Sequence, residues 1–345
     1  MNINPSVNTL SVKELNQPGL KKRDRSIDVA KGVLIILVVV GHSGAEIGKY
    51  INWWRMPVFF MLSGFFFKPL NSYSEFIPFL KKNVKGMVVP YFVYLLLINI
   101  FPLIVMWSSG DLPAFNKRLF AIIYGGRALG NENGVFWFIS VLFLTRILLA
   151  YLSTFLENKV IFYLTCIFLL VGVMESLIFH HTAKTVRFPL NIDVVAVASF
   201  FYFGGFMIKP YLKLPKVVSY VLVLFAAVIY TGAVLGEYTF SLDMKASDYY
   251  NLPFVILVPG LFLVVTTEVA KFLTTFKYPL SFFEYLGLNS LFIMYLHLFV
   301  NYSFKNYLGI KYGPLIFTLF GVFIPLVFGY FVSKNRFSKK LFMGS

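Results

Sequence analysis

The sequence has little cysteine and little acidic charge. Its one cysteine, Cys166, lies in a long apolar run, which excludes an intramolecular disulfide and a cysteine-based metal site. The motifs HExxH, GxSxG, CxxC and the Walker lysine loop are absent, so hydrolase, ATPase and metalloprotease functions have no support. Asp and Glu number 15 against 31 Lys and Arg. We expect this basic excess to meet anionic membrane lipids and no nucleic acid, because no basic soluble segment presents it.

Long runs of hydrophobic residues dominate the sequence. Hydrophobic residues make up 58% of the 345 residues, and 41 of them are Phe. The apolar runs are too long and too uniform for the alternating strands of a membrane barrel. They predict an all-α, polytopic integral membrane protein of about ten transmembrane helices. The predicted spans are 27–44, 54–67, 86–107, 134–156, 160–179, 192–208, 217–236, 252–270, 284–304 and 312–333.

The basic residues predict the orientation. If the N-terminus is cytoplasmic, the inside segments hold 19 Lys and Arg and the outside segments hold nine, which favours both termini inside. We therefore expect a multi-pass protein of the cell inner (plasma) membrane. It divides into a disordered cytoplasmic tail (1–24), a membrane domain (25–335) and a cytoplasmic C-terminal tail (336–345).

Ionisable residues cluster on the first span, RSIDVAKGVLIILVVVGH. Asp28, Lys31 and His42 fall on one helical stripe, and His42 lies roughly 16 Å along the helix from Lys31. Charged groups in hydrocarbon are expensive and mark functional paths, and imidazole suits general-base chemistry. The alternatives are a hydrogen-bonded histidine at the helix end and a snorkelling cluster of Arg25, Asp28 and Lys31.

Arg55 opens the second span 13 residues after His42, across a short outer hairpin. The two side chains are predicted to converge, and a guanidinium there can stabilise an oxyanion. Arg55 is equally well explained as an interfacial anchor. The second span is short and contains Pro57 and Gly64, so a broken or tilted helix is expected.

The stretch SEFIPFLKKNVKGMVVPYF predicts a cytoplasmic interfacial helix, capped by Ser74, that leads into the third span. Its Lys82 and Lys85 can bind phosphates, and positive-inside anchoring explains them equally well. Further along, Trp137 opens the fourth span, and Asn289 and His297 lie on the ninth. We expect these three to contact a substrate, although hydrogen bonding between helices also explains the polar pair.

Together these motifs resemble the acyltransferase 3 family of integral membrane acyltransferases. Asp28-x-x-Lys31 followed by ten residues and His42 resembles the family's basic-x10-His motif. RMPVFFMLSGFFFK is similar to the following segment in the fucose 4-O-acetylase-like branch, and Lys82-x-x-Lys85 to a basic pair before the third span. FWFI at 136–139 and NSLFIMYLH also fit. The family often has His where Arg55 stands and Arg where 31, 82 and 85 are Lys.

The resemblance implies transfer of an acetyl group from acetyl-CoA to a hydroxyl of a surface glycan or its lipid-linked precursor, without a metal. His42, Arg55, Asp28 and Lys31 are the expected catalytic residues, and Arg25, Lys82 and Lys85 the expected CoA-binding residues. The pantetheine arm would follow the stripe from Lys31 to His42. A transporter or glycan flippase remains the main alternative, because intramembrane charge also marks transport paths. A non-catalytic assembly partner is the third.

Overall fold

The computed structural model describes residues 24–182, 188–237, 240–249 and 251–344. Within these ranges there is no β-strand, and the single β-type pairing is an isolated bridge between Asp243 and Asp248. The α-helices are α1 (Arg25–His42), α2 (Gly48–Gly64), α3 (Tyr73–Asn83), α4 (Val89–Ser108), α5 (Leu112–Tyr124), α6 (Phe136–Leu152), α7 (Asn158–Thr182), α8 (Ile192–Ile208), α9 (Lys216–Leu235), α10 (Leu252–Leu273), α11 (Lys277–Leu288), α12 (Ser290–Tyr307), α13 (Pro314–Ser333) and α14 (Arg336–Met343). The shorter helical segments are η2 (Val84–Val88), η3 (Gly126–Ala128), η4 (Asn131–Asn133), η5 (Pro189–Asn191) and η6 (Lys209–Leu212).

The predicted all-α, polytopic class is confirmed. Seven helical segments of the described residues are long and apolar enough to cross a membrane, or eight if the bent pair α11–α12 forms one span. The other two predicted spans correspond to α1 and α2. α1 carries Arg25, Asp28 and Lys31 in its 18 residues, and α2 has only 17 residues, so neither has the apolar length of an ordinary span. The count of ten and the cytoplasmic termini stay predictions.

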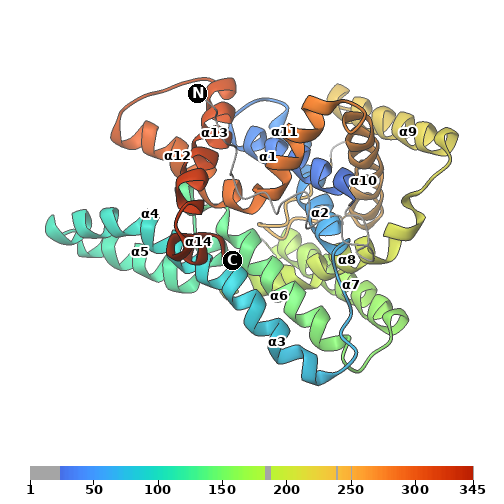
Figure 1. Cartoon of the computed structure of the whole chain (residues 1–345), viewed down its shortest axis with the longest axis horizontal. Helices are drawn as coiled ribbons and strands as arrows, with labels where there is room; N and C mark the ends of the chain where they lie inside the picture. Colours follow the sequence, from blue (N-terminus) through green and yellow to red (C-terminus); the bar gives the residue numbers. More distant parts are fainter. Residues whose placement is uncertain (1–23, 183–187, 238–239, 250, 345) are drawn as a thin grey trace, which may run out of the picture.

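α1 is the central helix of the bundle, because α2, α10, α11, α12 and α13 all pack against it (Figure 1). Its closest neighbour is α11. A Cβ atom on Gly32 would lie 2.0 Å from the Phe283 carbonyl oxygen, and one on Gly287 would lie 1.8 Å from the Asp28 carbonyl oxygen. Only glycine lets two helix backbones approach this closely, as in other membrane helix pairs. This contact fixes the N-terminal half of α1.

The ninth predicted span, 284–304, is not one straight helix. It is α11 followed by α12, bent by 76° at Asn289. Asn289 lies between the two helices with a non-helical backbone, and its side-chain amide donates to the Tyr285 carbonyl at 2.8 Å. The bend lets α11 cross the start of α1 while α12 runs beside its end.

α2 is continuous from Gly48 to Gly64 with Pro57 inside it, so the helix is not broken, and the alternative of a tilted helix stays a prediction. α3 forms where the interfacial helix was predicted and leads through the π-helical turn η2 into α4. Its N-cap residue is Ser72, however, and the Ser74 hydroxyl bonds to the Ser72 hydroxyl at 2.7 Å. Ser74 therefore lies within the first turn and is not the cap.

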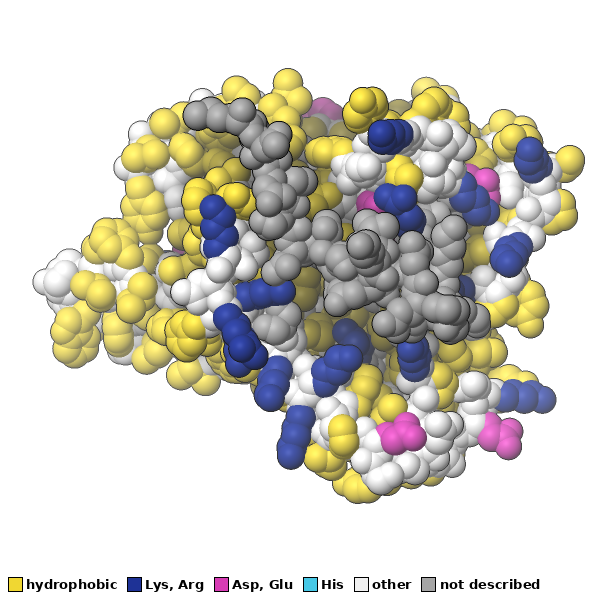
Figure 2. Space-filling model, in the orientation of Figure 1, with side chains coloured by type: hydrophobic (Ala, Val, Ile, Leu, Met, Phe, Trp, Pro, Cys, Tyr) yellow, Lys and Arg dark blue, Asp and Glu magenta, His cyan; other side chains and the backbone are white. Residues whose placement is uncertain are grey.

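The C-terminal residues 336–343, predicted as tail, form the short helix α14, which docks on α4. The Tyr94 hydroxyl donates to the Phe342 carbonyl at 3.1 Å. Figure 2 shows Lys and Arg side chains gathered over α3 and α14, while apolar side chains cover the projecting pair α4 and α5. An apolar flank beside a basic rim is the pattern of a bundle edge at a membrane interface.

Candidate active site

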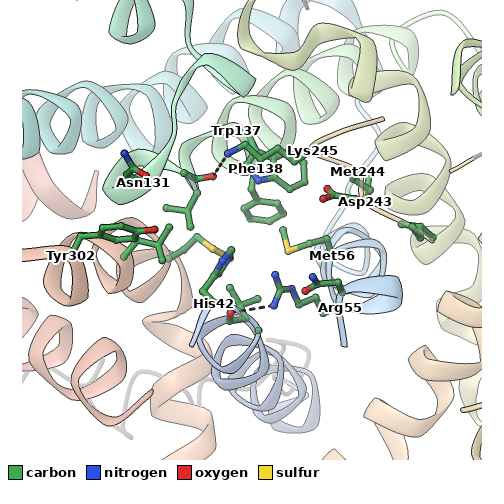
Figure 3. A pocket seen from close by; sticks show the side chains of 18 residues that line it. His42, Arg55, Met56, Asn131, Trp137, Phe138, Asp243, Met244, Lys245 and Tyr302 are labelled. Carbon is green, nitrogen blue, oxygen red and sulfur yellow. Dashed lines mark hydrogen bonds between the residues drawn. The ribbon is translucent and has the colours of Figure 1, made fainter. Parts of the chain in front are cut away.

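A cavity of about 270 Å³ lies at the C-terminal end of α1 (Figure 3). One wall comes from α1 and α2, and the facing wall comes from the start of α6 and from residues 240–249. On the predicted topology, this cavity lies towards the outer side of the membrane. Its lining residues are Val38, Gly41, His42, Asn52, Arg55, Met56, Asn131, Gly134, Val135, Trp137, Phe138, Leu242, Asp243, Met244, Lys245, Met294, Leu298 and Tyr302.

His42 is the last residue of α1, and its side chain reaches into the cavity (Figure 3). It keeps an accessible surface although the helices of the bundle surround it. Its ring centroid lies 5.5 Å from that of His297 on α12. An accessible imidazole on a pocket wall can exchange a proton with a bound hydroxyl.

His297 is fully buried behind His42 and does not line the cavity. Its Nδ1 lies 3.1 Å from both the Ile293 and the Met294 carbonyl oxygens. Because carbonyls only accept, Nδ1 carries the hydrogen and Nε2 is left as an acceptor. Nε2 has no hydrogen-bond partner among the described residues. His297 therefore packs against the His42 ring without a hydrogen bond to it, and the predicted substrate contact of His297 is not seen in this geometry.

Arg55 shares the cavity with His42, so the predicted convergence of these two residues is present. Its side chain is buried, and its Nη1 donates to the carbonyls of Val38 and Leu37 at 3.3 and 3.4 Å. A Cβ atom on Gly41 would lie only 1.4 Å from that Nη1. Glycine at 41 thus provides the room for the guanidinium beside His42.

Sequence reasoning missed residues 240–249, here named the 240–249 loop. It connects α9 to α10, yet Phe240, Leu242 and Met244 are buried in the bundle. Apolar residues at 240, 242 and 244 alternate with polar ones, which is the pattern of an extended segment with one buried face. This alternation is the feature of the sequence that predicts a partly buried loop. The loop brings Asp243 and Lys245 to the cavity wall.

Hydrogen bonds hold this loop in place. Arg127 donates to the Lys245 carbonyl and to the Ser247 hydroxyl, and it forms a buried ion pair with Asp193 at the start of α8. The Asn191 amide adds a second bond to the Lys245 carbonyl at 3.1 Å. Buried hydrogen bonds and ion pairs of this kind rigidify the segment that they hold. The backbone of Lys245 is therefore held in place, which limits the positions that its side chain can reach.

The Lys245 ammonium reaches across to the α6 side of the cavity. It donates to the carbonyls of Leu129 and Gly134, each at 3.0 Å. Burial lowers the pKa of Lys245, and the nearby Asp243 carboxylate opposes that shift. Trp137, predicted to contact a substrate, lines the same region of the cavity (Figure 3).

The other predicted residues lie at the opposite end of α1 or outside the cavity. Arg25 pairs with Glu284 of α11, and Asp28 is buried beside α11. The Lys31 ammonium lies 4.0 Å from the centre of the Phe66 ring. Asn289 sits at the α11–α12 bend and does not line the cavity. No cluster of three or more potential metal ligands occurs in the described part of the chain.

The expected route for the donor along α1 is closed. Ile35 and Val38, which lie between Lys31 and His42 on the predicted stripe, are 0% and 1% exposed. The cavity reaches Val38 and does not include Ile35 or Lys31. A pantetheine arm cannot lie along the stripe in this conformation, because packed side chains occupy it.

Comparison with known proteins decides the family. The family model described as an acyltransferase domain, that of the acyltransferase 3 family, matches residues 24–334, which is most of the chain and all ten predicted spans. The chain belongs to the acyltransferase 3 family. No curated protein and no solved structure was found to match it. This acyltransferase is therefore a multi-pass membrane protein, and the narrower assignment to the fucose 4-O-acetylase-like branch stays a prediction.

Proposed function

We propose that this acyltransferase moves an acetyl group from acetyl-CoA to a hydroxyl of a cell-surface polysaccharide, or of its lipid-linked precursor, at the inner membrane. The observation that carries the proposal is the meeting of His42 and Arg55 in one cavity of a chain from this family. The cavity is lined by both polar and aromatic side chains, as sugar-sized ligands require.

His42 acts as the base in this proposal. It takes the proton from the acceptor hydroxyl as the hydroxyl oxygen bonds to the acyl carbon. The bond from that carbon to the thioester sulfur then breaks, and His42 returns the proton to the departing thiolate. The reaction is balanced without a metal, and general-base catalysis of this kind contributes about 10²–10⁴-fold. The His297 ring packs behind His42, with 5.5 Å between the ring centroids, and this contact limits how far the His42 ring can turn.

Arg55 stabilises the negative charge that develops on the acyl oxygen. Two of its contacts are to the Leu37 and Val38 carbonyls, which place the guanidinium next to the last turn of α1. Its Nε has no hydrogen-bond partner among the described residues. A donor held in advance by fixed carbonyls costs no reorganisation when the oxyanion forms.

The donor's phosphates are proposed to bind at the basic rim over α3 and α14 (Figure 2). Lys82 and Lys85 are exposed there, and Gly344 after α14 packs against Gly86. Arg25, the third expected CoA-binding residue, is already paired with Glu284 of α11. Because the stripe along α1 is packed, the acyl group could reach His42 along it only if Ile35 and Val38 moved.

Release of free thiol tests the function directly. Purified full-length protein in detergent is expected to release CoA thiol from acetyl-CoA when an acceptor glycan is added, and mass spectrometry should find one acetyl group on the glycan. A flippase would move glycan without consuming the thioester. Thiol release that does not depend on acceptor, or its absence across a panel of surface glycans, would contradict the proposal.

Substitution of the rim lysines tests donor binding. Lys82→Gln with Lys85→Gln is expected to raise the KM for acetyl-CoA about tenfold and to change kcat little, because lost ground-state binding appears in KM. Salt should raise KM more in the wild type than in this variant, since screening acts on the removed charges. Lys216→Gln with Lys277→Gln, both exposed and predicted on the same side, is the matched control. Equal changes of KM in the two double variants would mean that Lys82 and Lys85 serve only to orient the protein in the membrane.

A further inference from the structure

Two cations of the cavity have no carboxylate of the described residues within ion-pair distance. Arg55 is buried, and Lys245 is largely enclosed between the 240–249 loop and the start of α6. Among the described residues, neither forms an ion pair. Asp243, the one carboxylate on the cavity wall, is exposed and accepts from the Ala246 backbone amide at 3.2 Å. It acts on both cations only at longer range, one negative charge against two positive ones. Removing a charge from water without a partner is costly, so this arrangement favours a ligand that supplies the missing negative charge.

Both cations also keep unused hydrogen-bond donors. The Lys245 ammonium has three donors, and its two protein partners are the Leu129 and Gly134 carbonyls. The Arg55 guanidinium has five, and its Nε is buried without a partner in the described part of the chain. Figure 3 shows the two side chains on facing walls of the cavity, with the Phe138 and Met56 side chains between them in this view. Buried polar atoms normally find partners, so these donors indicate a bound group.

We propose that the acyl acceptor carries an anionic group, a carboxylate or a phosphate, and that Lys245 binds it. This inference rests on the proposed function and names the class of its acceptor. The geometry separates the three roles. His42 and Arg55 lie on the wall formed by α1 and α2, where His42 acts on the acceptor hydroxyl and Arg55 on the acyl group. Lys245 lies on the facing wall and binds the anionic group of the acceptor. Anchoring by the Arg127 network keeps Lys245 in place before the acceptor arrives.

Direct binding measurements on the purified full-length protein test this by calorimetry. The probes are glucuronic acid and its neutral methyl ester, and glucose 6-phosphate and glucose. At least one acidic probe is expected to bind tenfold or more tightly than its neutral counterpart. A preference in the first pair identifies a carboxylate, and one in the second pair identifies a phosphate. Equal binding within both pairs would overturn the inference.

Three variants separate charge recognition from folding. Lys245→Met should abolish the preference for the acidic probe and leave binding of the neutral one within about twofold. Asp243→Asn keeps the acceptor atom for Ala246 and should tighten acidic binding several-fold, a gain that misfolding cannot produce. Lys49→Met removes an exposed lysine that does not line the cavity and should change nothing. If Lys245→Met binds neither the acidic nor the neutral probe, and Asp243→Asn does not bind the acidic probe more tightly, Lys245 has only a structural role through its hydrogen bonds to the Leu129 and Gly134 carbonyls.

Failure of the inference and failure of the proposed function give different results. Charge-selective binding without thiol release would leave the anion site standing and contradict the acyltransferase activity proposed for the cavity. Thiol release with acidic and neutral acceptors at equal KM would confirm that activity and overturn the anion site.

Discussion

His42→Ala is expected to lower kcat for acyl transfer by about 10²–10⁴-fold, because the acceptor hydroxyl loses its base. KM for both substrates should change little, since the side chain contributes mainly to the transition state. The amount of protein in the membrane should stay near that of the wild type. His42 lines a cavity, and its truncation removes no packed core group. Single-turnover thiol release, measured on purified wild type and variant, gives the comparison.

His181→Ala is the matched control for that experiment. His181 is exposed at the end of α7 and does not line the cavity, so its loss should leave kcat unchanged. Retention of more than about a tenth of the activity by His42→Ala would remove His42 from the role of base. Such a result would leave the family assignment intact, because that assignment rests on the whole of residues 24–334.

The sequence predicted best what depends on local composition. Long apolar runs predicted α4, α6, α7, α8, α9, α10 and α13 to within a few residues, because each run is itself a helix that is long and apolar enough to cross a membrane. The hairpin between His42 and Arg55 predicted that the two would meet, because a short connection keeps neighbouring helices together. Their catalytic roles stay predictions.

What the sequence could not predict depends on contacts between distant segments. Arg25 pairs with Glu284, which is 259 residues away, and no residue near Arg25 in the sequence predicts this ion pair. The bend at Asn289 follows from the packing of α11 on α1, which the apolar run over 284–304 does not reveal. Lys245 reached the cavity only because Arg127 and Asn191 hold its loop inward. In the linear sequence Lys245 was one more basic residue of an outer loop.

Gly41→Ala is expected to lower kcat by about 10²–10³-fold without unfolding the protein. The new methyl group would occupy a point 1.4 Å from Arg55 Nη1, so the guanidinium must leave its place beside His42. The displaced atoms are the far end of a flexible side chain, and the backbone need not move. Loss of one positioned oxyanion donor typically costs this factor in kcat. Steady-state kinetics, with thermal stability measured in the same detergent, provide the readout.

A double-mutant cycle shows whether the methyl group acts through Arg55. In the Arg55→Ala background the added methyl meets no guanidinium, so Gly41→Ala should cost little there, and the two losses should be far from additive. Gly260→Ala on α10 has nothing within 4 Å of its new Cβ and serves as the control for adding a methyl group to a helix. Additive losses would mean that Gly41 shapes the cavity for the substrate itself. An active Gly41→Ala variant would show instead that Arg55 does its work from another position, or does none.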